Sequence, residues 1–160
     1  MKYRILSTKE LEPLRDDFIQ FLSANTITGE DWVDIKSNKP SEVSRLIEIF
    51  SEIVWEKSLE KIKYLEHRDD KYLKVFYCGE NKMEMVGFKV SEKNAPSLLD
   101  QKTFKLLASG RLKFSELNAV FSSSEKKYKI SRNMDLFTMI ESGCVPCEKA
   151  YYYGIKSLLK

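Results

Sequence analysis

The sequence has few of the motifs that indicate a catalysed reaction. Its six glycines are scattered, so it has no glycine-rich loop that could cradle a phosphate. The common hydrolase and metalloprotease motifs are absent as well. We therefore predict no catalytic and no cofactor-binding residues, and we favour a protein that is not an enzyme.

Long apolar runs are also missing. No stretch reaches the 18 or so consecutive apolar residues of a transmembrane helix, and residues 1–14 lack the apolar core of a secretory signal. Three cysteines are an odd number, which does not favour a secreted disulfide framework. These absences predict a cytoplasmic protein without a membrane partner.

The composition is that of a folded chain. Of 160 residues, 42% are hydrophobic and 32% are charged, which fits one domain spanning residues 1–160. The net charge of +3 is divided unequally. Residues 1–80 hold 13 Lys and Arg against 16 Asp and Glu, whereas residues 81–160 hold 14 against 8. The basic C-terminal half could meet an anionic partner, but the favoured interpretation is that both halves are solvated faces of one domain.

Helical signals fill the N-terminal part of the chain. Ser7 with Glu10 and Thr28 with Asp31 have the spacing of capping boxes, which begin helices. A long apolar stripe then predicts a helix over about 41–67, with His67 at its C-terminus.

The period then changes to alternation. Residues 72–90 read as a β-hairpin, and residues 111–121 contain a probable third strand, although a helix is not excluded there. Gly110 closes a preceding helix, Ser131 caps a following one, and a last helix is predicted from Pro146 to about Leu159. We predict an α+β fold in which helices, including both terminal segments, pack on a small antiparallel sheet.

Three stretches carry a resemblance, namely "MKYRILSTKEL", "FLSANTITGEDW" and "FSEIVWEKSLEKIKYLEH". With them the chain resembles a family of small bacterial cytoplasmic proteins that have no assigned function. The resemblance is strongest over residues 1–67 and is seen again near "LFTMIESG". It implies a stand-alone cytoplasmic protein, and it implies no ligand and no catalytic residue.

The pair Cys144–Cys147 is the sharpest local feature. With His67 and Cys78 it could complete a Cys₃His zinc site, but the spacing matches no common zinc module. Proline in the third position resembles a thiol–disulfide motif, but the strand and βαβ frame of that motif are missing. The favoured interpretation is structural: the pair joins two helices, and Cys147 starts the apolar face of the second.

Two other stretches suggest partners. Lys126, Lys127, Tyr128, Lys129 and Arg132 could bind nucleic acid through phosphates and a stacked base, unless they form an ordinary solvated loop. In the last helix, Tyr151 is predicted to face the core, so Tyr152 and Tyr153 would point to solvent or to a partner.

Two functions from different classes follow. The leading prediction is a non-enzymatic protein-interaction module that binds another protein or itself. The alternative is a nucleic-acid-associated protein that uses the basic C-terminal half, and a zinc-stabilised domain is a weaker one. No small-molecule ligand is identifiable from the sequence.

Overall fold

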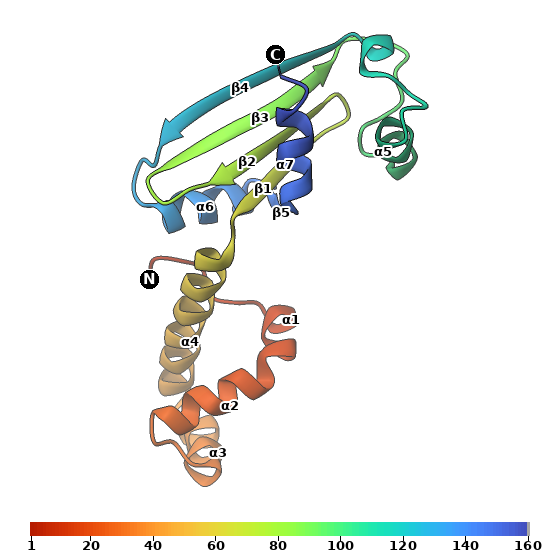
Figure 1. Ribbon diagram of the computed structural model, residues 1–160. Coiled ribbons are helices and arrows are strands. Elements are labelled where there is room, and N and C mark those ends of the chain that lie inside the picture. Colours follow the sequence, from red (N-terminus) through yellow and green to blue (C-terminus); the bar gives the residue numbers. More distant parts are fainter. Residues whose placement is uncertain (160) are drawn as a thin grey trace. The chain divides into compact units, whose positions relative to one another are not determined.

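The computed structural model describes residues 1–159 (Figure 1). The chain divides into two compact units, Met1–Glu60 and Lys61–Lys160. That residues 1–160 fold as one domain stays a prediction. The α+β class is confirmed, with helices at both ends of the chain and one antiparallel sheet.

The unit Met1–Glu60 is built from helices. They are α1 (Thr8–Leu11), the short 3₁₀ helix η1 (Glu12–Leu14), α2 (Arg15–Ala24), α3 (Gly29–Asn38) and α4 (Pro40–Lys61). Both predicted capping boxes are confirmed, because Ser7 and Thr28 accept the amide hydrogens of Glu10 and Asp31. Each cap satisfies backbone donors that a helix start leaves unpaired.

The core of this unit is small and aromatic. Leu22, Ile35 and Leu46 are buried in it. The ring of Phe18 meets the rings of Trp32 and Phe50 edge to face, with centroids 5.3 and 5.0 Å apart. Such edge-to-face pairs add to the free energy gained from burial alone.

The unit Lys61–Lys160 is organised by the sheet. Its strands are β1 (Tyr64–Arg68), β2 (Tyr72–Cys78), β3 (Lys82–Val90), β4 (Ala119–Lys127) and β5 (Val145–Pro146), in the spatial order β4-β3-β2-β1-β5. The predicted hairpin 72–90 is confirmed as β2 and β3. The other elements are α5 (Gln101–Ala108), η2 (Phe114–Leu117), α6 (Arg132–Glu141) and α7 (Lys149–Lys156).

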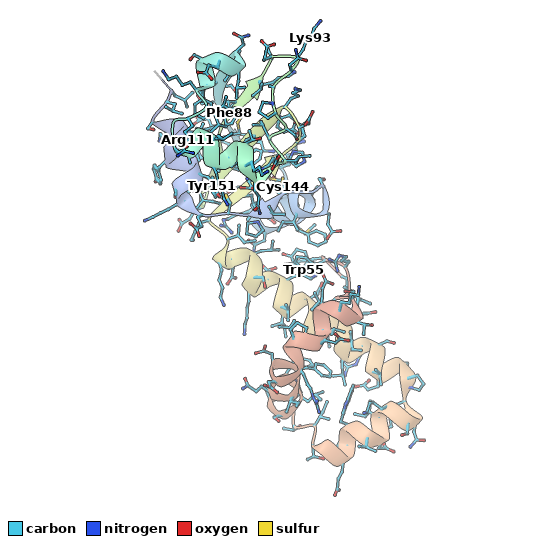
Figure 2. The ribbon with its side chains drawn as sticks, turned by 90° about the vertical axis from the view of Figure 1, so that its right-hand side faces the viewer. Trp55, Phe88, Lys93, Arg111, Cys144 and Tyr151 are labelled. Carbon is cyan, nitrogen blue, oxygen red and sulfur yellow. The ribbon has the colours of Figure 1, made fainter. Side chains whose placement is uncertain are left out.

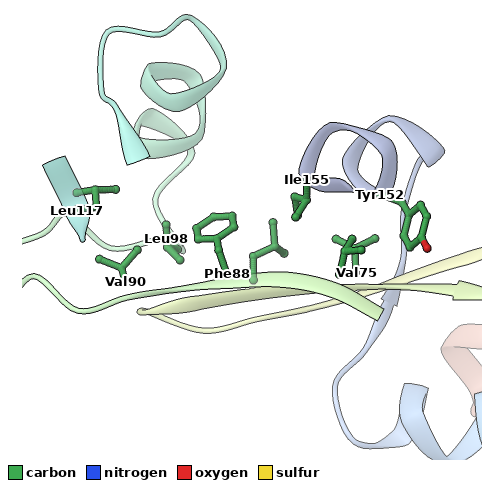
Figure 3. Packing of buried hydrophobic residues seen from close by; sticks show 9 residues of the cluster. Val75, Phe88, Val90, Leu98, Leu117, Tyr152 and Ile155 are labelled. Atoms are coloured by element: carbon green, nitrogen blue, oxygen red, sulfur yellow. The ribbon is translucent and has the colours of Figure 1, made fainter. Parts of the chain in front are cut away.

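One face of the sheet holds the main core. We call it the apolar face, and its central residues are Leu73, Val75, Tyr77, Val86, Phe88, Val90 and Phe121. Tyr152 and Ile155 of α7 and Leu98 and Leu117 of the α5 region pack on it (Figure 3). In Figure 3 the cluster lies on the side of the sheet where α7 runs.

The predicted end of the long helix is wrong. Helix α4 stops at Lys61, and His67 lies in β1, where it is paired with Lys74 of β2. The Glu and Lys residues of this stretch suit a helix when taken locally. Pairing with β2 overrides that preference, because a strand is stabilised by partners far away in sequence.

Two further boundaries differ from the predictions. Within 111–121, residues Phe114–Leu117 form η2, and β4 begins only at Ala119 and runs on through the serines that read as a loop. Pro146 lies in β5 and not at the start of a helix, so α7 begins at Lys149. None of the helices within residues 1–159 is both long and apolar enough to cross a membrane.

Candidate binding surfaces

In the predicted zinc set, His67 lies in β1, Cys78 ends β2, and Cys144 and Cys147 flank β5. His67 is opposite Lys74, and Cys78 follows four residues later on that strand, about 13 Å along it. Cys147 packs with the apolar-face cluster, whereas His67 alternates with Tyr64 and Glu66 and so lies on the opposite face. Within residues 1–159, no group of three or more His, Cys, Asp or Glu side chains could hold a metal ion. The structure gives the zinc set no support.

The cysteines are free thiols in buried surroundings. Burial raises the pKa of the Cys78 thiol to about 11. Burial, and then the nearby Glu66 carboxylate, raise the pKa of Cys147 to about 12, and burial also raises the pKa of Cys144. Thiols with such pKa values are protonated at neutral pH, whereas exchange chemistry needs the thiolate.

The CxxC stretch lies between α6 and α7, as predicted, and it also extends the sheet. Val145 and Pro146 pair with Glu66 and Leu65 of β1, and the amide of Cys147 donates to the carbonyl of Tyr64 at 3.1 Å. Cys147 packs against the core cluster but precedes α7, so the prediction that it starts the apolar face of that helix is wrong.

The predicted nucleic-acid residues do not form one surface. The hydroxyl of Tyr128 donates to the carbonyl of Gly79 at 2.6 Å, and Arg132 donates to the carbonyls of Ile62 and Cys78. These two side chains hold the segment after β4 to the sheet. Lys126, Lys127 and Lys129 are exposed.

Lys126 and Lys127 are neighbours in β4, so their side chains lie on opposite faces of the sheet.

The tyrosines of α7 are placed differently from the prediction. Tyr152 is 3% exposed and belongs to the core, whereas Tyr151 is 42% exposed and Tyr153 54% exposed. The predicted directions of Tyr151 and Tyr152 are wrong, because the helix starts at Lys149 and packs through Tyr152 and Ile155. Tyr153 points outward as predicted.

A groove of about 380 Å³ lies between α5 and α7. None of its lining residues is charged; they are Leu73, Phe88, Phe104, Leu107, Ala108, Phe114, Ala150, Tyr151, Gly154, Ile155 and Leu158. Figure 2 labels Phe88 and Tyr151 from this lining and Arg111 from the loop after α5. We call it the α5–α7 groove.

The two segments that form the α5–α7 groove carry cations. Residues 101–113 and 149–159 carry no acidic residue, and their exposed cations are Lys102, Lys105, Arg111, Lys113, Lys149 and Lys156. Beside the groove, the guanidinium carbon of Arg68 lies 3.9 Å from the centroid of the Phe104 ring. The lining of the groove is therefore uncharged, and the cations of the two segments that form it are not among its lining residues.

The face of the sheet opposite the apolar face forms a second surface, which we call the basic face. Its positions follow from strand alternation and register. They are Leu65, His67, Tyr72, Lys74, Phe76, Cys78, Met83, Met85, Gly87, Lys89, Val120, Ser122, Ser124 and Lys126. None of these positions is acidic, whereas the apolar side of the same strands carries Glu66, Glu84 and Glu125.

The centre of the basic face is hollowed. A depression of about 220 Å³ is lined by Lys74, Phe76, Met83, Met85, Ser124, Glu125 and Lys126. The carboxylate of Glu125 pairs with Lys82 Nζ at 2.8 Å, so its charge is already matched. Sequence reasoning missed this surface, although the alternation of 72–78 with 83–90 was the signal that could have shown it.

Together these observations define a class of protein: an α+β chain whose sheet packs its main core on the apolar face and carries a basic, partly exposed surface on the other face, where Leu65, Cys78 and Met83 are buried. The chain belongs to the family of unknown function DUF6495, whose model matches residues 1–160. No curated protein shows significant similarity to it, and no solved structure does either.

Proposed function

We propose that this protein is a protein-interaction module, and that the α5–α7 groove takes an acidic, amphipathic segment of another protein. The observation that supports this proposal is an uncharged groove formed by two segments, 101–113 and 149–159, that carry exposed cations and no acidic residue.

The contents of the groove fit a side-chain ridge. Rings from Phe88, Phe104 and Phe114 line it, and Leu158 at its edge is 43% exposed. An amphipathic helix lays its apolar ridge into grooves of this kind. Apolar contact supplies affinity, and aromatic residues commonly dominate it.

The exposed cations of the segments 101–113 and 149–159 would favour an acidic partner. Acidic residues flanking the apolar ridge would meet Lys102, Lys105, Lys149 and Lys156. Complementary charge mainly raises the association rate and rejects partners of the wrong sign. A basic amphipathic segment would be repelled by the same cations.

Site-specific photo-crosslinking in cell extract tests the proposal. A photoreactive phenylalanine derivative replaces Tyr151 in the groove or, as a control, Ile130, which is 77% exposed and lies outside the groove. We expect crosslinks from position 151 to peptides that are acidic and amphipathic, and we expect Leu158→Asp to abolish them. Equal crosslinking from both positions, or crosslinks only to a second copy of this chain, would refute the proposal.

A further inference from the structure

The basic face is separate from the α5–α7 groove, because the two lie on opposite sides of the same sheet. Part of the basic face is accessible along β2, β3 and β4, whereas Cys78, Met83 and Gly87 are buried. Lys74, Lys89 and Lys126 are exposed, and Phe76 and Met85 are partly exposed. A ligand on this face would therefore leave the groove free.

We propose that the basic face binds single-stranded nucleic acid, with a base stacked on Phe76 and phosphates held by Lys74 and Lys126. A sheet surface that combines aromatic rings with cations is a recurrent way to bind single strands. The proposal concerns a surface different from the loop 126–132 that the sequence suggested.

The register places the cations on either side of the ring. Phe76 is in line with Met85 of β3 and Ser124 of β4. Lys74 lies in the next row on one side, with Gly87 and Ser122, and Lys126 lies in the next row on the other side, with Met83. Successive rows on one face are about 6.6 Å apart, so the two ammonium groups stem from rows about 13 Å apart. An extended single-stranded nucleic acid that stacks one base on the Phe76 ring would pass both Lys74 and Lys126.

Small side chains keep this surface open. Gly87, Ser122 and Ser124 occupy the positions beside Phe76 and Lys74. A β-carbon on Gly87 would lie 3.4 Å from Lys74 Cγ, so the stem of Lys74 extends across that glycine. The serine hydroxyls can donate to phosphate or to base edges.

The charges on this face favour nucleic acid over an acidic protein segment. Glu125 lines the hollow beside Lys126, but Lys82 Nζ pairs with its carboxylate at 2.8 Å, and Asp69 in the turn after β1 accepts the amides of Lys71 and Tyr72. In the hollow, the partly buried ring of Phe76 lies between the cations of Lys74 and Lys126. This arrangement is complementary to a base that has a phosphate on either side. A duplex does not fit as well, because its bases are stacked inside and cannot reach Phe76.

Fluorescence anisotropy with a labelled oligothymidylate of about 12 nucleotides tests the proposal at about 50 mM salt. Phe76→Leu keeps the apolar bulk and removes the ring, and we expect it to weaken binding about tenfold. Lys74→Gln with Lys126→Gln should lower the slope of log affinity against log salt by about 1.4. Thermal unfolding of each variant shows that the fold is kept.

The control variant removes two exposed cations outside the basic face. Lys113→Gln with Lys127→Gln removes one charge before η2 and one on the apolar side of β4, and we expect binding within about twofold of the unchanged protein. Equal losses from both double variants would show attraction by net charge only and would overturn the proposal. Equal binding of a duplex or of polyglutamate, or no binding of the oligonucleotide at all, would overturn it as well.

Discussion

The two faces of the sheet in Lys61–Lys160 are made from alternate residues of the same strands. Leu73 is 1% exposed on the apolar face, and its neighbour Lys74 is exposed on the basic face. A shift of one residue in strand pairing would exchange the two faces. Burial of the apolar residues therefore fixes the register, and the register in turn places the cations around Phe76.

The largest expected effect tests the contrast between neighbours. Leu73→Ala removes a buried side chain that packs in the apolar-face cluster, so we expect it to lower the free energy of unfolding by about 2–5 kcal/mol. Lys74→Ala should change it by about 0.5 kcal/mol or less. Urea unfolding followed by circular dichroism measures both. Similar losses for the two variants would mean that the faces do not differ as described.

A smaller effect is expected where the backbones of β2 and β3 come close together. A β-carbon on Gly87 would lie 2.6 Å from the carbonyl oxygen of Leu73, so Gly87→Ala must displace a strand. We expect a loss of about 1–3 kcal/mol. Gly154→Ala is the control, because no atom lies within 4 Å of its added carbon and alanine favours a helix by about 0.5–1 kcal/mol. Thermal unfolding should move in opposite directions for the two.

The smallest expected effect concerns pH. The pKa of Cys78, about 11 in the folded protein, exceeds the ordinary value of 9.0 because the thiol is buried. Between these values the folded state holds the proton more tightly than the unfolded state does, so stability falls as pH rises from 9 towards 11. We expect Cys78 to contribute on the order of 1 kcal/mol to this fall.

Cys78→Ala should flatten the fall in stability above pH 9 and leave the slope between pH 6 and 8 unchanged. Urea unfolding at each pH measures both slopes. Parallel curves for the variant and the unchanged protein across the alkaline range would contradict the assigned pKa.

Local signals explain what could be predicted. The helix starts at Ser7, Thr28 and Ser131 are marked by side chains that accept nearby backbone amides, and those contacts span only three residues. The hairpin 72–90 was equally visible, because its strands alternate and its turn is short. Strand β1 was missed, because its residues suit a helix until β2 pairs with them.

The candidate surfaces depend on contacts that no local pattern contains. The α5–α7 groove brings Leu73 and Phe88 together with Phe104 and Ile155, which are up to 82 residues apart in the sequence. The predicted zinc residues were chosen because the chain has only one histidine and three cysteines, and the predicted nucleic-acid residues because they lie close together in sequence. The sheet separates the members of each set. Sequence distance is a poor guide once strands pair across long connections.

The sequence by itself determined the α+β class, the capped helices and the central hairpin, because each rests on hydrogen bonds or alternation within a few residues. Only the tertiary structure decided that β4 completes the basic face and that Val145 and Pro146 of the CxxC stretch pair with β1 as strand β5. The tertiary structure also decided that the side chain of Tyr152 is buried in the core. These choices follow from which distant segments bury the most apolar surface together, and that property belongs to the whole chain.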